Sequence, residues 1–212
     1  MISKNLLALP RSVLAILLVT FVFLPSRSFA GPPLICHPYE IGAAKSLPGG
    51  DWGHGLSRAY DRKTLVRDTL ELLTPETPIV VRMETLRRAA LYATGNFRTG
   101  GQTAEDRAMA TALLGELRTR AEKTSGPMNA HAAFDLGFYA ATLRQTAIDP
   151  MLDGYALLVR AATLLPERPE VEFALALAST AERERLAAHL ARARAGAGKD
   201  SLLATNLASH FE

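Results

Sequence analysis

The feature that most constrains the fold is the punctuation of the chain from about residue 57 to its end. Segments of helical length, rich in Ala, Leu, Arg and Glu, are separated by proline, glycine or helix-capping residues. Within a segment, apolar residues recur every three or four positions, as in Ile79, Met83, Leu86 and Ala90, which is the spacing of one helix face. No segment alternates β-branched and polar residues like a strand. The pattern predicts an all-α fold of seven to eight antiparallel helices.

Several helix ends are marked by particular residues. Thr77-Pro78 is typical of a helix start, because proline at the first position forfeits no hydrogen bond. Thr103 and Asp106 have the spacing of a capping box. Asp149-Pro150 is predicted to begin a later helix, and Asp200 to cap a short terminal one.

The helix predicted at about residues 129–146 differs from the others in its charge. Between Ala130 and Leu143 its only formally charged side chain is Asp135. A helix that is apolar nearly all round is usually covered on most sides. We therefore expect this helix to be central in the fold.

Residues 1–30 have the layout of a secretory signal peptide. Lys4 and Arg11 are basic, residues 13–24 form an apolar run with one threonine, and residues 28–30 end in a small residue suited to cleavage. An uncleaved anchor is the alternative, but a spanning helix needs roughly 20 mostly apolar residues, and this run is shorter and closed by Pro25. We expect export to the periplasm or the extracellular medium, with no stable membrane span after cleavage.

Loss of the signal peptide changes the charge balance. The chain has 24 basic and 21 acidic residues, and three basic residues but no acidic ones precede residue 31, which leaves 21 of each. Nucleic-acid binding depends on an excess of Lys and Arg that neutralises phosphates. A neutral mature chain therefore argues against nucleic acid as a partner.

Residues 31–56 read as an irregular N-terminal arm, followed by an α-helical domain at residues 57–212. The arm holds the single cysteine, Cys36, together with His37 and His54. Thiolate and imidazole groups suit zinc or copper, so these three residues are a candidate metal site. Because one cysteine cannot form an internal disulfide, a disulfide-linked dimer through Cys36 is a second hypothesis.

The alternative interpretation of the arm is packing. Cys36 would then be a small buried hydrophobe, while neighbouring apolar residues fasten the arm to the helices. The anchors expected on this interpretation are Pro38, Tyr39, Ile41, Leu47 and Trp52.

His131 and Asp135 are the nearest approach to an acid/base pair. They are four residues apart, so on a helix both side chains lie on one face and could share a hydrogen bond. The alternative is structural: His131 lies in an exposed first turn, and Asp135 pairs with an arginine of a neighbouring helix, because a lone buried carboxylate is costly.

The segment at about residues 131–170 resembles a degenerate tetratricopeptide hairpin. It has Leu136-Gly137 on its first helix, then Ala161 with Pro166 five residues later. The resemblance implies a repeat-like hairpin array that acts as a scaffold or binds a protein or peptide, with no catalytic residues carried over. The residues 34–38, Leu-Ile-Cys-His-Pro, are similar to openings of some exported bacterial proteins. We therefore predict an exported, non-enzymatic binding protein, with a metal- or thiol-dependent protein as the alternative.

Overall fold

The computed structural model describes residues 34–52, 55–95, 101–125, 127–199 and 201–211. The chain divides into two units, residues 1–30 and residues 31–212. The first unit, which contains the predicted signal peptide, lies outside the described residues. The arm and the helices belong to the second unit.

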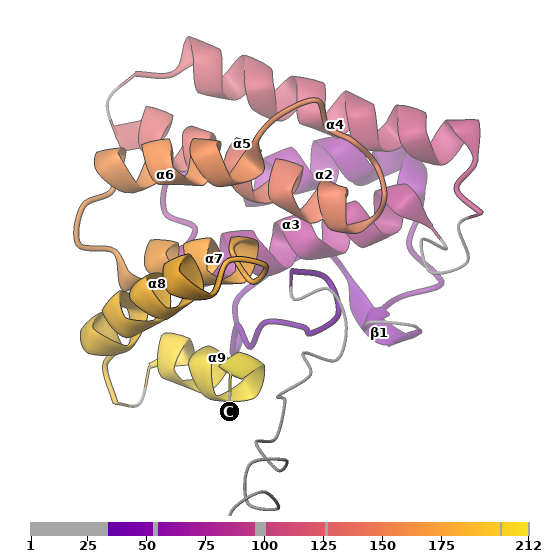
Figure 1. Ribbon diagram of the computed structural model, residues 1–212. Helices are drawn as coiled ribbons and strands as arrows, with labels where there is room; N and C mark the ends of the chain where they lie inside the picture. Colours follow the sequence, from indigo (N-terminus) through magenta and orange to yellow (C-terminus); the bar gives the residue numbers. More distant parts are fainter. Residues whose placement is uncertain (1–33, 53–54, 96–100, 126, 200, 212) are drawn as a thin grey trace, which may run out of the picture. The chain divides into compact units, whose positions relative to one another are not determined.

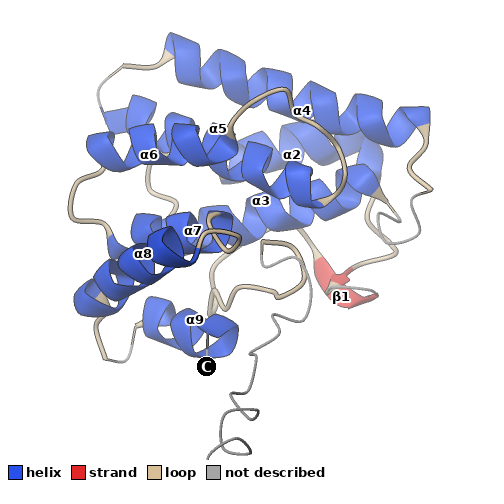
Figure 2. Cartoon of the chain, viewed as in Figure 1, coloured by secondary structure: helices blue, strands red, loops and turns tan. Residues whose placement is uncertain are grey.

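Within the described residues the protein is mostly helical (Figures 1 and 2). The elements in chain order are β1 (Gly49–Trp52), the 3-10 turn η1 (Arg62–Thr64), α2 (Leu65–Leu72), α3 (Ile79–Thr94), α4 (Ala104–Lys123), α5 (Pro127–Gln145), α6 (Gly154–Leu164), α7 (Pro169–Ala178), α8 (Arg183–Gly196) and α9 (Leu202–Phe211). Among the described residues, Gly49 of β1 forms an isolated antiparallel bridge with Leu56. The all-α prediction is confirmed.

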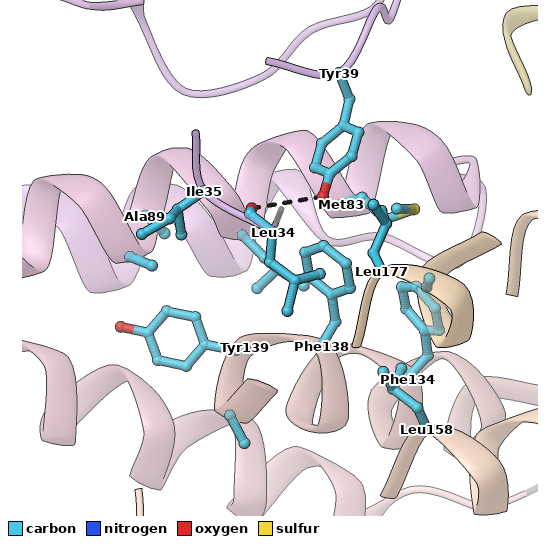
Figure 3. Close-up of a cluster of buried hydrophobic side chains, with 14 of the residues drawn as sticks. Leu34, Ile35, Tyr39, Met83, Ala89, Phe134, Phe138, Tyr139, Leu158 and Leu177 are labelled. Atoms are coloured by element: carbon cyan, nitrogen blue, oxygen red, sulfur yellow. Dashed lines mark hydrogen bonds between the residues drawn. The ribbon is translucent and has the colours of Figure 1, made fainter. Parts of the chain in front are cut away.

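The helices follow one another in space as they do in the chain. From α2 to α8 each helix packs against the next, and α3, α5 and α7 also contact one another. The core lies where these three helices meet (Figure 3). Its large buried side chains include Met83 of α3, Phe134, Phe138 and Tyr139 of α5, and Leu177 of α7.

Close approach of α5 and α6 depends on two glycines. A Cβ atom on Gly137 would lie 2.8 Å from the backbone nitrogen of Leu158, and one on Gly154 would lie 2.4 Å from that of Ala141. Real Cβ atoms essentially never come this close to backbone atoms. Gly137 belongs to the Leu-Gly pair of the predicted hairpin, but a tetratricopeptide-like repeat stays a prediction.

The capping box at the start of α4 is confirmed. Thr103 Oγ1 accepts from the Asp106 amide at 3.1 Å, and Asp106 Oδ2 accepts from the Thr103 amide at 2.9 Å. The usual partner is Glu or Gln, but Asp106 also accepts from Arg62 of η1. The acid therefore joins two elements in addition to capping one.

The predicted start of α6 at Asp149-Pro150 is wrong. Helix α6 begins at Gly154 and is capped by Asp153, whose Oδ1 accepts from the Ala156 amide at 3.0 Å. Asp149 instead accepts from the Met151 amide in a turn, and Met151 has a φ of 53°, which a helix cannot contain. Asp200, the predicted cap of α9, lies outside the described residues.

Helix α5 is central, as predicted, but α3 is enclosed even more completely. Every α3 residue except Arg88 is buried, including the charged Arg82, Glu84 and Arg87. Helix α3 has four charged residues, and three of them, Glu84, Arg87 and Arg88, lie under the N-terminal arm. Because the arm has little secondary structure of its own, its backbone groups need partners from elsewhere.

Side chains of α3 supply those partners. The Tyr39 amide donates to Glu84 Oε2 at 3.0 Å. Arg87 donates to the Ile35 carbonyl at 3.0 Å and Arg88 donates to the Leu47 carbonyl at 2.5 Å. These charged side chains thus hold the arm on α3. In return, the backbone groups of the arm give the buried charges polar partners.

The arm is also anchored by apolar side chains and by the last helix. Tyr39, Ile41 and Leu47 are buried as the packing interpretation requires, whereas Pro38 is exposed, so its prediction as an anchor is wrong. The side chain of Trp52 lies outside the described residues. Asn206 of α9 binds both backbone groups of Glu40: its Oδ1 accepts from the amide at 2.8 Å, and its Nδ2 donates to the carbonyl at 2.9 Å.

Two further apolar residues of the arm, Leu34 and Ile35, are almost completely buried and were not predicted. Figure 3 shows them in the core beside Tyr39, whose hydroxyl donates to the Leu34 carbonyl. None of the described helices is both long enough and apolar enough to cross a membrane.

Candidate functional site

A cavity of about 320 Å³ lies among residues of α2, α3, α4, α5 and the segment that joins α2 to α3. Its apolar wall is formed by Leu70, Leu73, Pro75 and Ala132. Pro75 is exposed and Ala132 is buried, so the cavity runs from the surface to the core. Its volume is near the lower end of the range for ligand pockets, which suits one side chain and its flanking groups.

The polar end of the cavity holds a buried ion pair. Arg82 Nη1 donates to Asp135 Oδ2 at 2.6 Å, and the two side chains are 1% and 5% exposed. The other two nitrogens of Arg82 donate to the carbonyls of Thr77 and Thr74. The arginine is therefore fixed by three partners and holds the carboxylate in place.

The second oxygen of this carboxylate has no protein partner. Asp135 Oδ1 is buried and has no hydrogen bond to any residue that the structure describes. Burial raises the pKa of Asp135 to about 6, against the opposing effects of the Arg82 and Arg120 charges. A buried carboxylate oxygen without a partner is costly, so this atom is ready to accept a hydrogen bond.

His131 lies beside the same cavity but does not form the predicted acid/base pair. Its Nδ1 is buried without a hydrogen-bond partner among the described residues, and the same holds for Asp135 Oδ1. Its ring is half-buried rather than exposed, because the cavity wall covers it. Burial, with the charges of Arg82 and Arg168, lowers the pKa of His131, so the ring is neutral at neutral pH.

Asp135 is paired with an arginine of a neighbouring helix, as the structural interpretation requires. That interpretation did not say which arginine. The sequence contains a signal for Arg82, because it lies three residues after Ile79 and four before Leu86, on the apolar face of its helix. A cation in such a position needs a buried acid, and Asp135 is the only formally charged side chain between Ala130 and Leu143.

Arg120 of α4 was not predicted as a site residue. It is half-buried and lines the cavity, and its Nη1 donates to the Leu73 carbonyl at 3.3 Å. Within the described part of the chain it forms no ion pair, and the partner of the Asp135 carboxylate is Arg82. Nothing in the α4 sequence separates Arg120 from Arg107 or Arg118, which are exposed.

The candidate metal residues are only partly described. Cys36 is half-buried and packs against the core, while His37 is exposed and its ring lies 5.7 Å from that of His210. His54 lies outside the described residues. No group of three or more His, Cys, Asp or Glu side chains within the described ranges could hold a metal ion, so a zinc or copper site stays a prediction, as does a dimer through Cys36.

A second polar cluster, also not predicted, joins α6, α7 and α8. His189 lies between the Tyr155 hydroxyl, 2.9 Å from Nε2, and Glu172 Oε2, 2.7 Å from Nδ1. Arg192 donates to the same carboxylate oxygen at 2.8 Å. Each member is bound by another, and His189 is buried, so the cluster fastens three helices together.

Comparison with known proteins adds no further identification. The chain matches no protein-family model, and it has no significant similarity to any curated protein or solved structure.

Proposed function

We propose that this chain is an exported, non-enzymatic α-helical protein that binds a protein or peptide segment in the cavity among α2, α3, α4 and α5. The single observation that carries the proposal is Asp135 Oδ1, a buried acceptor without a partner among the described residues, on a residue that lines the cavity. An N–H group of a bound peptide would satisfy this atom.

The rest of the cavity supports a peptide segment as the ligand. Its apolar wall offers space for one side chain, and removal of apolar surface from water would contribute most of the affinity. Arg82 and Asp135 are fixed by their hydrogen bonds before any ligand arrives, so little order has to be created on binding. The composition of residues 1–30 supports export.

The test is a titration of the ¹⁵N-labelled protein with pooled random heptapeptides, followed by two-dimensional NMR. We expect the amide signals of Leu70, Arg120 and Ala132 to move most. The variant Ala132→Phe, which fills the cavity, should abolish these shifts. Ala112→Phe adds the same side chain at an exposed position of α4 and should leave them unchanged.

Thermal unfolding of both variants shows whether each remains folded. The proposal fails if Ala132→Phe is folded and binds the peptides as well as the unmodified protein does. It also fails if peptide-induced shifts occur only at residues away from the cavity.

A further inference from the structure

We propose that the cavity selects the C-terminal residue of a peptide, with its free carboxylate at Arg120, its amide N–H at Asp135 Oδ1 and an apolar side chain against Leu70 and Leu73. This inference rests on the proposed function and specifies the end of the peptide that is bound. Three independent features of the cavity lead to it: its charge, its unpaired acceptor and its apolar wall.

The first feature is a net positive charge. Arg82 and Asp135 neutralise each other at 2.6 Å, and the His131 ring is neutral at neutral pH. Arg120 is the remaining charged side chain of the cavity lining, and no acid among the described residues pairs with it. A half-buried guanidinium without a counter-ion favours an anion, and a single carboxylate balances a single arginine.

The second feature is a hydrogen-bond acceptor on a residue that lines the same cavity. Arg120 and Asp135 are both lining residues, and Asp135 Oδ1 is buried and unpaired among the described residues. A ligand that fits both groups must carry an anion and an N–H or O–H donor close together. The last residue of a peptide does so, since its amide N–H and its carboxylate flank one Cα atom.

The third feature decides which terminal residue fits. Leu70, Leu73, Pro75 and Ala132 form an apolar wall, so a terminal residue with an aliphatic side chain gains most from burial. An acidic terminal side chain would lose its hydration against this wall. Leucine, isoleucine and valine are therefore the preferred last residues.

The experiment compares the pentapeptide Gly-Gly-Ser-Gly-Leu as the free acid with the same peptide as the C-terminal amide, by isothermal titration calorimetry. A charge-assisted hydrogen bond in a partly buried site corresponds to about tenfold or more in affinity. We expect the free acid to bind at least about tenfold more tightly than the amide. N-acetyl-leucine should compete with it, because this compound carries the same terminal groups.

Protein variants test whether Arg120 causes the preference for the free acid. Arg120→Gln should bring the affinity for the free acid down to that for the amide, whereas Arg107→Gln, the same change at an exposed position of α4, should have no effect. Arg120→Lys should restore part of the preference. Raising the salt concentration should weaken binding of the free acid and not that of the amide.

Different outcomes separate this inference from the proposed function. The unmodified protein could bind the free acid and the amide equally well, with both bindings lost in Ala132→Phe. This result would overturn carboxylate selection and leave the cavity as a peptide site. Acid-selective binding that persists in Ala132→Phe would place the site elsewhere and overturn both. Acid-selective binding that persists in Arg120→Gln but is lost in Ala132→Phe would overturn carboxylate selection by Arg120 alone. Absence of pentapeptide binding, with heptapeptides still bound in the cavity, would overturn carboxylate selection alone.

Discussion

The most demanding test of the fold is the replacement of Glu84 by glutamine. Glu84 is completely buried and accepts four hydrogen bonds, two from Arg87 at 2.7 and 2.9 Å, one from Arg88 at 2.6 Å and one from the Tyr39 amide at 3.0 Å. Glutamine has almost the same shape, but it is neutral and turns one acceptor into a donor. It would face donors on every side, and the negative charge that pairs with Arg87 at 2.7 Å would be lost.

Breaking a buried ion pair by removal of one partner costs about 3–5 kcal/mol. A domain of this size is stable by about 5–15 kcal/mol, so Glu84→Gln should fold but unfold at a much lower urea concentration. Circular dichroism during urea denaturation measures this loss. Native-state hydrogen exchange should show, in addition, faster exchange at the Tyr39 amide, because the arm loses its attachment to α3.

The matched control is Glu182→Gln. Glu182 also accepts from an arginine at 2.7 Å, but its side chain and that of Arg185 are 54% and 51% exposed, and such surface pairs contribute about 1 kcal/mol or less. In a double-mutant cycle, Glu84→Gln and Arg87→Met should together cost clearly less than the sum of the two single changes. The reasoning is refuted if Glu84→Gln costs no more than Glu182→Gln, or if the double change is additive.

Three further predictions concern helix packing, the arm and pH. Gly154→Ala should lower the free energy of unfolding by about 1–3 kcal/mol, because the new methyl group would meet the α5 backbone. Gly115→Ala, in open space on α4, should instead raise it by about 0.5–1 kcal/mol. Equal effects would contradict the close approach of α5 and α6. Asn206→Ala should cost about 2 kcal/mol in the free energy of unfolding, because two hydrogen bonds to the arm are lost. Asn206→Asp should have an intermediate effect. Unchanged hydrogen exchange at the Glu40 amide would show that Asn206 does not hold the arm. The folded-state pKa of Asp135 is raised from 3.8 to about 6, so the folded protein binds this proton more tightly than the unfolded chain does. Raising the pH from about 4 to 7 should therefore cost the unmodified protein about 2 kcal/mol relative to Asp135→Asn. Parallel stability curves for the two proteins would refute this prediction.

The sequence was sufficient for the helices because their signals are local. The start of α3 directly after Pro78, the capping box of α4 and the apolar character of α5 each depend on residues within a few positions of one another. The start of α6 was missed because Asp149-Pro150 and Asp153 both have the composition of a helix start. Only the backbone conformation of Met151 separates them.

The cavity was harder to predict from the sequence than the helices, because it depends on contacts between distant segments. Asp135 was found as the single acid of an apolar helix, but its partner Arg82 is 53 residues away. Arg120 has no distinguishing neighbour in its own helix, where several arginines occur. Its position in the cavity lining follows only from the packing of α4 beside α2 and α5, which no local sequence pattern specifies.

Helix α3 shows why its burial could not be predicted from amphipathicity. At about 100° per residue, Glu84, Arg87 and Arg88 lie roughly 200°, 140° and 240° around the helix from Arg82, so the charges occupy two opposite faces. One face contributes Arg82 to the cavity, and the other binds the backbone of the arm. A helix that is solvent-exposed on one side would concentrate its charges there. On α3 they are distributed because each face is covered by a different part of the chain that needs polar partners. The same helix therefore contributes to the cavity and also holds the arm.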